Sequence, residues 1–505
     1  MFNAIDRILN KIPMYRITLY IVGLIWTAAI GLGFLGVLPY SGFSIALSGI
    51  FLMLVSWIAN EIFAWAFNAS TNHESAYITG LILALIVPPA VAVADLPLLA
   101  TVAVVAMASK YILAIHNKHL FNPAAIAVFI TGFIGLSASW WIGTGAMLPF
   151  VAVFGYLLVR KINRTDMVLS FIITALVIGI GYDIVNGLNA LMFLQQTFIS
   201  SGFIFLATVM LTEPLTTPPT RTLRIIYGSI VAFFFLPFVH LGSIYAAPEL
   251  ALILGNVFVY IVSPKQKLIL TLKKKIRLSE DLYDFIFESD QKFKFRAGQY
   301  LEWTLNDVSF NTKGNRRYFT IASAPSEKEI RVGIRLQDPV SEFKKEMLAM
   351  KPGDTIIAAQ LSGDFVLPKN KSKKLAFIAG GIGITPFRSM VKDLVDRNDH
   401  RPTTLFFSGA SVGDIIYTDV FEDARKKLGM KTVYTVTDKK AEAKGWGGNI
   451  GRITKEMIKE VMPDYRQRQF YISGSQALVS GMKQMLLDLG IKKSNIKTDY
   501  FSGFI

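Results

Sequence analysis

Four consecutive residues near the middle of the chain could together hold a flat cofactor that carries phosphate. They are Arg317, Tyr318, Phe319 and Thr320, in a stretch that alternates as a β-strand does. A guanidinium can pair with a pyrophosphate, an aromatic ring can pack on an isoalloxazine, and a hydroxyl can donate to a ring nitrogen. These residue types predict a flavin site in which Thr320 acts as the catalytic hydroxyl.

A second motif further along the chain suits a dinucleotide. The apolar run from Leu375 to Ala379 predicts a buried parallel strand that leads into a glycine-rich turn, and Thr385 then opens a helix. Backbone N–H groups and the positive end of the helix dipole would face an incoming phosphate at this turn. The predicted binding glycines are Gly380, Gly381 and Gly383.

The order of these two motifs resembles that of the ferredoxin–NADP reductase family. Residues Gly298 to Tyr300 are similar to the strand that precedes the family's flavin motif, and Lys351 to Asp354 and Gly363 to Phe365 match the end of its barrel. The resemblance implies an antiparallel β-barrel that binds FAD, followed by an α/β parallel-sheet domain that binds NADH or NADPH.

The same resemblance assigns further site residues. Ser341 stands where the family places a Ser or Thr that binds pyrophosphate. Ser473, followed by Gly474, stands where many relatives have a cysteine that contacts the nicotinamide, so Ser473 is a candidate catalytic residue. Phe501 belongs to an ending that is similar to the family's aromatic finish. The loop from Ser408 to Asp414 contains neither Arg nor Lys, which favours NADH because a 2′-phosphate would require a cation there.

The composition divides the chain in two. Residues up to about Val262 are overwhelmingly apolar, and charges become frequent beyond that point. We expect three domains: a polytopic membrane domain over residues 1–263, an FAD-binding β-barrel over 264–368 and an NAD(P)H-binding α/β domain over 369–505. The absence of cysteine excludes disulfides and cysteine-ligated iron–sulfur clusters.

The apolar part predicts an α-helical bundle of about ten membrane spans, some of them short or broken, because a full span takes about twenty residues. Basic residues flank these spans on one side, which the positive-inside rule makes cytoplasmic. We therefore expect a protein of the cytoplasmic (inner) membrane with both termini and the reductase domain inside the cell. Lysines of the connection after the last span favour membrane lipid headgroups. The expected spans are 17–38, 43–59, 77–90, 96–109, 123–136, 146–159, 167–182, 198–211, 225–239 and 250–262.

Three polar junctions interrupt the apolar part. They are Ser75 to Pro89, Phe121 to Ala124 with Asn122, and Thr212 to Pro214 with Glu213. A short helix broken by Pro near a polar start is tolerated in a membrane where it lines a cavity. These junctions resemble motifs of a family of membrane proteins, which comprises the B subunit of the sodium-pumping NADH:quinone oxidoreductase and the D subunit of the Rnf complex.

That second resemblance implies a flavin held within the membrane. The family's Ser-Gly-Ala-Thr signal for covalently linked FMN is missing, and the loop from Ser137 to Thr144 is too short to contain it. We therefore expect a non-covalent second flavin, FMN or riboflavin, contacted by Asn122, Thr212 and Glu213.

Several functions fit these features. The leading hypothesis is transmembrane electron transfer from NAD(P)H through FAD and a membrane flavin to a quinone or to an extracytoplasmic flavoprotein. Alternatives are a haem-based ferric-reductase-like protein, with His73, His116, His119 and His240 as candidate ligands, and a transporter with a regulatory flavodomain. A net charge of +16 invites a nucleic-acid partner, but we reject it because the basic residues cluster beside apolar spans and in the connection.

Overall fold

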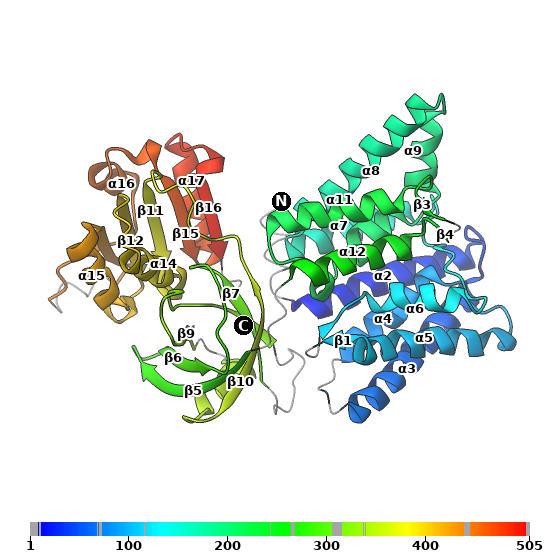
Figure 1. Ribbon diagram of the computed structural model, residues 1–505, viewed down its shortest axis with the longest axis horizontal. Helices are drawn as coiled ribbons and strands as arrows, with labels where there is room; N and C mark the ends of the chain where they lie inside the picture. The colour runs from blue at the N-terminus through cyan, green and yellow to red at the C-terminus, as the bar shows by residue number, and fades with distance from the viewer. Residues whose placement is uncertain are drawn as a thin grey trace. The chain divides into compact units, whose positions relative to one another are not determined.

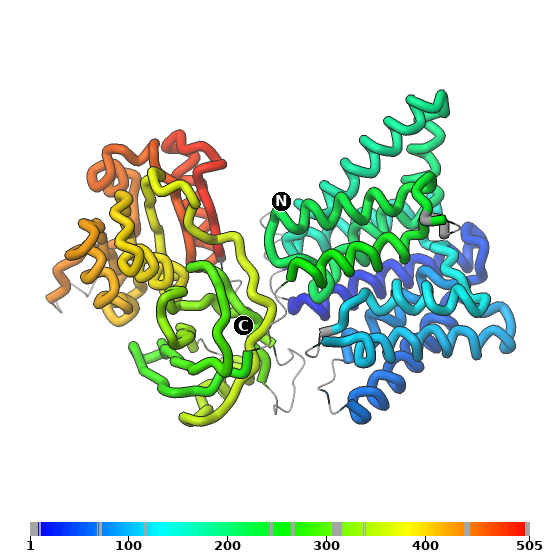
Figure 2. Tube along the Cα trace, in the orientation of Figure 1, coloured from blue at the N-terminus to red at the C-terminus, as the bar shows by residue number. Residues whose placement is uncertain are grey.

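The chain forms two compact units, Met1–Lys265 (unit 1) and Gln266–Ile505 (unit 2). The computed structural model describes residues 9, 12–67, 69, 73–115, 118–242, 244–263, 268–305, 316–336, 338, 340–438 and 445–500. Figure 1 labels the helices and strands of both units, and Figure 2 follows the same chain as a Cα trace.

Unit 1 is helical, as its apolar composition predicts. Each of the ten expected segments contains helix, and two short β-hairpins interrupt the bundle. The helices are α2 (Met14–Phe34), α3 (Gly42–Ala66), α4 (His73–Ile86), α5 (Leu96–Ile112), α6 (Pro123–Gly132), α7 (Leu148–Ile162), α8 (Thr165–Val185), α9 (Ala190–Ile199), α10 (Phe203–Phe205), α11 (Arg221–Phe235) and α12 (Pro248–Val262). The hairpins pair β1 (Ala114–Ile115) with β2 (Lys118–His119), and β3 (His240–Leu241) with β4 (Ile244–Tyr245).

The expectation of about ten spans is wrong for the part of the chain that the structure describes. Four helices are long and apolar enough to cross a membrane, at Met14–Phe34, Gly42–Ala66, Val93–Ile112 and Thr165–Val185. A fifth results only if Ala190–Ile199 and Phe203–Met210, which meet at 62°, form one broken span. The helices α4, α6 and α12 are apolar but shorter, and Pro88 and Pro89 follow just beyond the end of α4.

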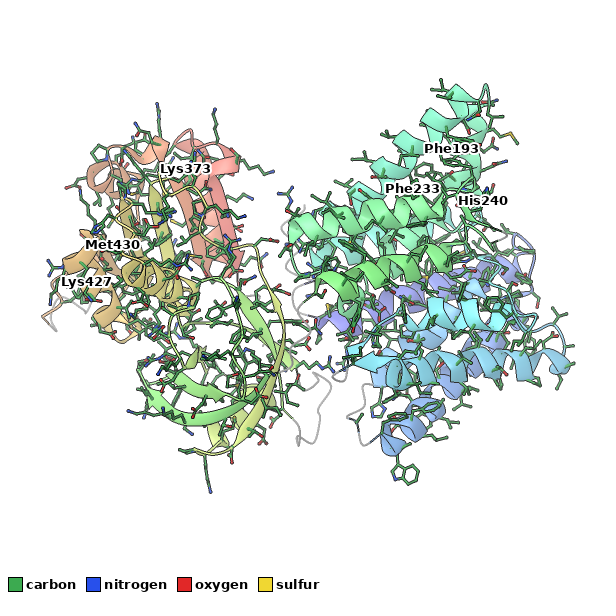
Figure 3. All side chains as sticks on the ribbon, in the orientation of Figure 1. Phe193, Phe233, His240, Lys373, Lys427 and Met430 are labelled. Carbon is green, nitrogen blue, oxygen red and sulfur yellow. The ribbon has the colours of Figure 1, made fainter. Side chains whose placement is uncertain are left out.

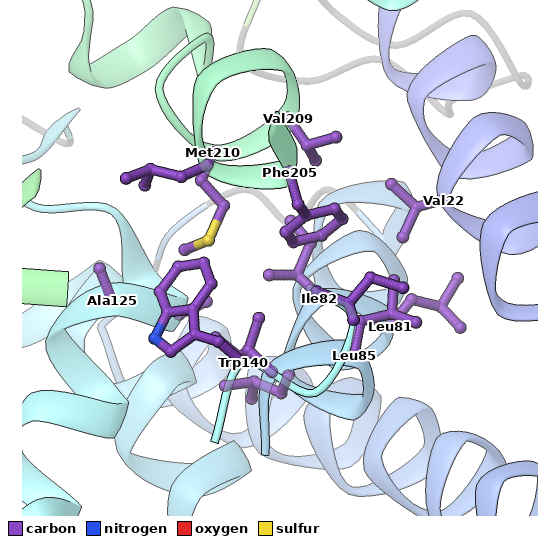
Figure 4. Packing of buried hydrophobic residues seen from close by; sticks show 14 of the residues in the cluster. Val22, Leu81, Ile82, Leu85, Ala125, Trp140, Phe205, Val209 and Met210 are labelled. Atoms are coloured by element: carbon purple, nitrogen blue, oxygen red, sulfur yellow. The ribbon is translucent and has the colours of Figure 1, made fainter. Parts of the chain in front are cut away.

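The interior of unit 1 is packed with large apolar side chains from several helices. Figure 4 shows Met210 pointing toward the indole of Trp140, with Ile82 and Leu85 of α4 in the same cluster. The outer surface is apolar as well, and α3 exposes Phe43, Ile50, Trp57, Ile62 and Trp65. An apolar outer surface of this kind suits contact with lipid.

The first part of unit 2 is a six-stranded antiparallel sheet with the order β8-β7-β10-β5-β6-β9. The chain just after β8 hydrogen-bonds to β9 from Ala322 N to Arg331 O (2.8 Å), so the sheet curls toward a barrel around Trp303 and other buried residues. Its elements are β5 (Leu268–Arg277), β6 (Leu282–Ser289), β7 (Tyr300–Thr304), β8 (Arg316–Thr320), β9 (Ile330–Arg335), α13 (Glu342–Ala349) and β10 (Thr355–Ser362).

The second part is a parallel sheet with the order β14-β13-β12-β11-β15-β16 and helices between the strands. In the central strand β11, Phe377 packs into one core and Ile378 into another, so the strand is buried on both faces. Its elements are β11 (Leu375–Gly380), α14 (Thr385–Asp396), β12 (Thr403–Gly409), α15 (Thr418–Leu428), β13 (Lys431–Val436), β14 (Asn449–Ile450), α16 (Lys455–Val461), β15 (Gln469–Gly474), α17 (Gln476–Asp488) and β16 (Ile496–Tyr500). In Figure 3, Lys373 precedes β11, and Lys427 lies in the last turn of α15.

Candidate functional site

The glycine-rich turn lies at the carboxyl edge of the parallel sheet, where dinucleotides bind in folds of this type. β11 ends at Gly380, and a 3-10 turn over Gly381–Ile384 leads into α14. Gly381 has a φ of +53°, a conformation that residues with a Cβ rarely adopt. The hydroxyl of Thr385 donates to the carbonyl of Ile382 (3.1 Å) and closes the turn.

The turn packs closely against strand β15. A Cβ on Gly383 would lie 2.5 Å from the carbonyl oxygen of Ser473 and 2.6 Å from Cα of Gly474, so only glycine permits this approach. Ser473 pairs with Ala379 in the sheet register and is fully buried. Its Oγ has no hydrogen-bond partner among the described residues, an unsatisfied group that a nicotinamide carboxamide would satisfy.

Strand β8 divides the four predicted flavin contacts between its two faces. Side chains two residues apart share a face, so Arg317 and Phe319 point one way, and Tyr318 and Thr320 point the other. Arg317 and Phe319 share the face of their register partners Trp303 and Leu301, which are buried in the barrel.

On the outer face, Tyr318 donates its hydroxyl to Glu302 Oε2 (2.6 Å). Thr320 is buried opposite Tyr300. The predicted catalytic hydroxyl therefore does not share a face with the predicted pyrophosphate ligand.

Arg317 lies beside the first turn of α13. The guanidinium lies 5.3 Å over the ring of Phe343, and the ring of Phe319 lies 5.9 Å from the same ring. Ser341 is the N-cap residue of α13, and its buried Oγ has no hydrogen-bond partner among the described residues. A helix N-terminus with an unsatisfied hydroxyl and an adjacent guanidinium fits the pyrophosphate of FAD.

The pKa values of the nearby cations also favour a bound anion beside α13. Burial lowers the pKa of Arg317. Burial also lowers the pKa of Lys344, and the charge of Arg317 lowers it further. Two cations whose protonated forms are disfavoured by burial and by mutual repulsion would both be stabilised by a bound anion.

The loop from Ser408 to Asp414 is held by its own carboxylate. Asp414 accepts from the backbone N–H groups of Ala410 (2.7 Å) and Ser411 (3.0 Å), and it also pairs with Arg335 at the end of β9. A Cβ on Gly381 would lie 3.2 Å from Nη1 of Arg335. Arg335 thus brings a cation from the antiparallel sheet to the dinucleotide turn, which the sequence of the loop itself could not reveal.

The last strand adds a carboxyl group beside Ser473. Asp499 of β16 is the register partner of Ser473, and burial raises the pKa of Asp499 to about 6. In the sequence, Asp499 stands out only as part of the ending motif. Phe501, the predicted aromatic residue of that ending, lies outside the described residues.

A cavity in unit 1 brings the three polar junctions together. Ser75 and Thr79 of α4, Asn122 before α6, and Thr212 with Glu213 all line it. It encloses about 60 Å³, and about 610 Å³ of unfilled space when its open mouth is included. Pockets for organic ligands are usually about 300–1,000 Å³, so a flat ring system would also occupy the mouth.

Ionisable and amide side chains surround this cavity. Lys110 donates to the carbonyl oxygen and to Oγ of Ser75 (both 3.1 Å), and His119 Nε2 lies 2.9 Å from Glu213 Oε1. Asn256 accepts from the backbone N–H of Asn122 (2.8 Å). The sequence gives no sign that Lys110 and Asn256 belong here, because they lie far along the chain from the motifs that they support.

Irregular backbone shapes the cavity. A π-helical turn over Leu206–Met210 precedes Thr212 and Glu213, and single π-helical turns occur frequently at functional sites. At the other end of α4, Trp141 Nε1 donates to the carbonyl groups of Ala84 (3.1 Å) and Val87 (3.0 Å). The short helix α4 is therefore capped by a side chain within unit 1, as short helices in a membrane require.

The described histidines do not form a facing pair on two spanning helices. His73 begins α4 beside Glu61 (3.1 Å), and His119 pairs with Glu213 from strand β2. His240 is exposed on β3, where Figure 3 labels it. The fourth candidate, His116, lies outside the described residues.

Comparison with known proteins concerns mainly unit 2. Residues 377–484 match the family model of the oxidoreductase NAD-binding domain. This range begins within β11 and ends within α17, so it includes the glycine-rich turn and Ser473.

Two curated relatives and one solved structure illustrate the similarity. A flavohemoprotein of Bacillus cereus is 24% identical over 242 residues, which are 45% of this chain and 59% of that protein. The F subunit of the Na(+)-translocating NADH-quinone reductase of Marinomonas sp. is 26% identical over 200 residues, 37% of this chain and 49% of that protein. The crystal structure of the FAD/NAD-binding domain of a nitric oxide dioxygenase from Vibrio cholerae covers 46% of this chain and 98% of its own, with 17% identity and a TM-score of 0.42.

The chain thus spans 59% and 49% of the length of these two curated relatives. The match that includes the dinucleotide turn lies entirely in unit 2. The C-terminal half of the chain therefore contains a domain that matches the oxidoreductase NAD-binding family.

Proposed function

We propose that the protein is an NAD(P)H-dependent flavin oxidoreductase that delivers electrons from a cytoplasmic nicotinamide cofactor into or across a membrane. One observation carries the proposal. The carbonyl groups of Ala322 and Ser323, directly after β8, accept hydrogen bonds from Arg388 (2.8 Å) and Ser389 (2.6 Å) of α14. The flavin strand and the helix of the dinucleotide turn are thereby adjacent in one unit, as hydride transfer between two cofactors requires.

Bound FAD would supply the chemistry of accepting a hydride and releasing electrons singly. Arg317 and Ser341, with the N-terminus of α13, would hold its pyrophosphate, and Phe319 would pack beside them. Thr320 would donate to the flavin ring from the other face of β8. Contact with both faces is feasible because β8 is the end strand of the described sheet.

The dinucleotide would lie on the turn formed by Gly380, Gly381 and Gly383, with its pyrophosphate at Thr385 and the N-terminus of α14. Ser473 and Gly474 would contact the nicotinamide. The absence of Arg and Lys from Ser408 to Asp414 favours NADH, and Arg335 is already paired with Asp281 and Asp414.

We further propose that unit 1 lies in the cytoplasmic membrane, in contact with lipid, and that its cavity holds a second, non-covalent flavin. Asn122, Thr212 and Glu213 line that cavity together, which supports the proposal. Electrons from FAD would pass through this flavin to a quinone or to an extracytoplasmic flavoprotein. Both termini and unit 2 would then be cytoplasmic.

Two measurements on the detergent-purified protein test this function. Anaerobic NADH should bleach the visible absorbance of FAD, and faster than NADPH does. Acid extraction should release FAD together with FMN or riboflavin. An oxidised flavin that neither coenzyme reduces would refute the reductase, whereas FAD as the sole extracted flavin would refute the second site alone.

A further inference from the structure

We propose that Arg388 is a positioning residue that fixes the dinucleotide turn at the correct distance from the flavin strand. The inference rests on the proposed hydride transfer, because a distance between two cofactors matters only if both bind. In the step that Arg388 would position, a hydride would carry two electrons from the reduced nicotinamide to FAD, and one proton from solvent would complete the reduced flavin. Arg388 itself neither gains nor loses a proton.

Arg388 reaches from the dinucleotide part of unit 2 to the flavin part. It lies in the first turn of α14, directly after the glycine-rich turn, and it is 3% exposed. Its Nη1 donates to the carbonyl oxygen of Ala322 (2.8 Å) and to Glu327 Oε2 (2.7 Å), and its Nη2 donates to Glu327 Oε1 (2.9 Å). The guanidinium therefore donates hydrogen bonds to both the backbone and a carboxylate of the segment that follows β8.

The next residue of α14 makes a parallel connection. Ser389 Oγ donates to the carbonyl oxygen of Ser323 (2.6 Å), and Ser323 Oγ accepts from the backbone N–H of Arg331 (3.1 Å). Two consecutive residues of α14 therefore bind two consecutive carbonyls. These carbonyls are only two and three residues beyond Thr320, so any shift of α14 is transmitted directly to the flavin strand.

A second set of contacts, made by Tyr417, Asp284 and Arg331, holds the guanidinium of Arg388 in place. Cζ of Arg388 lies 5.6 Å from the ring centroid of Tyr417, whose backbone has a φ of +59°. The hydroxyl of Tyr417 donates to Asp284 Oδ1 (3.1 Å), and Arg331 lies 3.3 Å from the other oxygen of Asp284. Tyr417 precedes α15, whereas Asp284 and Arg331 belong to the antiparallel sheet, so this layer also joins the two parts of unit 2.

Arginine and lysine would differ at this position. A lysine would keep the positive charge but could not hold two carboxylate oxygens and a carbonyl in one plane. Hydride transfer needs reacting atoms about 3–3.5 Å apart, and a displacement of about 1 Å lowers the rate by about a hundredfold. Arg388→Lys should therefore lower the rate of the chemical step without abolishing the binding of either cofactor.

The experiment uses the full-length protein in detergent with three variants. Arg388→Lys is the principal variant, and Ser389→Ala removes the parallel connection alone. Arg397→Lys is the matched control, because Arg397 lies just beyond the end of the same helix, is 60% exposed and pairs only with Asp393 among the ion pairs of the described residues. For each we would measure FAD per chain, the Kd for NAD⁺, the limiting rate of anaerobic FAD reduction by NADH, and its isotope effect with NADH deuterated at C4.

We expect the limiting rate to fall about ten- to a hundredfold in Arg388→Lys and about threefold in Ser389→Ala, with a larger isotope effect. FAD content and the Kd for NAD⁺ should stay within about twofold of the unmodified protein. The long-wavelength absorbance of nicotinamide stacked on reduced flavin should weaken, whereas the control should match the unmodified protein.

Two results would overturn the assignment. One is an unchanged limiting rate in both variants. The other is a rate loss that FAD release or weaker NAD⁺ binding explains in full. If Arg388→Lys does not fold, Ser389→Ala decides by the same criteria. Failure of the proposed function is distinct, since the unmodified protein would then not be reduced by NADH or NADPH.

Discussion

The candidate sites of the two units differ in the groups that form them. In unit 2 the dinucleotide turn is made mainly of backbone, and Gly383 matters because a side chain there would collide with Ser473. In unit 1 the cavity is surrounded by ionisable side chains, among them Glu213 beside His119 (2.9 Å) and Lys110 beside Ser75 (3.1 Å).

This difference has a physical origin. A phosphate in water-accessible surroundings can be bound by N–H groups and a helix dipole, which need glycine more than charge. A ligand among apolar helices meets few polar groups, and each buried polar group there needs a partner. We therefore expect substitutions at the dinucleotide turn of unit 2 to act through shape and those at the cavity of unit 1 to act through charge.

The largest effect on kinetics should come from adding a single methyl group to the dinucleotide turn, at Gly383. Gly383→Ala places a Cβ 2.5 Å from a backbone oxygen, so the KM for NADH should rise about a hundredfold or more while FAD stays bound. Gly481→Ala is the matched control, because no atom lies within 4 Å of a Cβ at that helical position. Steady-state kinetics and FAD content would measure both, and equal loss of both cofactors in Gly383→Ala would indicate misfolding instead.

Arg317→Ala tests a charge within unit 2. The loss of one charge-assisted pair with pyrophosphate should weaken FAD binding by about ten- to a hundredfold, or roughly 1.5–3 kcal/mol. The variant should lose FAD on dialysis but keep the flavin of unit 1, as acid extraction would reveal. Arg425→Ala, at a side chain that is 59% exposed on α15, should keep both. Full FAD occupancy in Arg317→Ala would contradict the assignment of this strand.

Asp284→Asn tests the buried charges that join the two parts of unit 2. Burial raises the pKa of Asp284 to about 6, although Arg331 opposes the shift. The folded form therefore holds this proton more tightly than the unfolded form does, so the free energy of unfolding falls by about 2 kcal/mol as the pH rises from about 4 to about 6. The Asn variant should lack this fall in denaturant titrations across that range, and an unchanged pH profile would rule out the shift.

Glu213→Gln should have the smallest effect and is specific to unit 1. The amide keeps a hydrogen bond to His119 but removes the charge at the cavity, so electron transfer from reduced FAD to an added quinone should slow about tenfold. Reduction of ferricyanide by NADH, which would require unit 2 alone under the proposed function, should be unchanged. Glu61→Gln is the control. The side chain of Glu61 is 40% exposed and also pairs with a histidine, His73. Equal slowing of both reactions would place Glu213 outside the membrane path.

The structure also separates features that looked alike in the sequence. Ten apolar segments were expected to span, and each contains helix, yet four of the described helices have the necessary length. Hydropathy reports composition, whereas the end of a helix depends on local backbone chemistry. Pro88 and Pro89 end α4 early, and a break after Ile199 bends the chain by 62° before Phe203.

The sequence by itself determined the features that depend on neighbouring residues. The glycine-rich turn after a buried strand and the apolar segments of unit 1 could be recognised because strand, turn and helix follow from local residue types and spacing. The polar junctions could be recognised for the same reason, whereas the expectation that they meet at one ligand came only from the resemblance to the membrane-subunit family.

Tertiary structure alone decided which distant side chains meet. Arg388 reaches Ala322 and Glu327, Arg335 reaches the dinucleotide turn, and Asn256 supports Asn122 across 134 positions of sequence. Tertiary structure also decides which face of β8 lies toward α13. Arg317 is on that face, and Thr320 is on the opposite one. Such contacts depend on how sheets curl and helices pack, and no local pattern specifies that geometry.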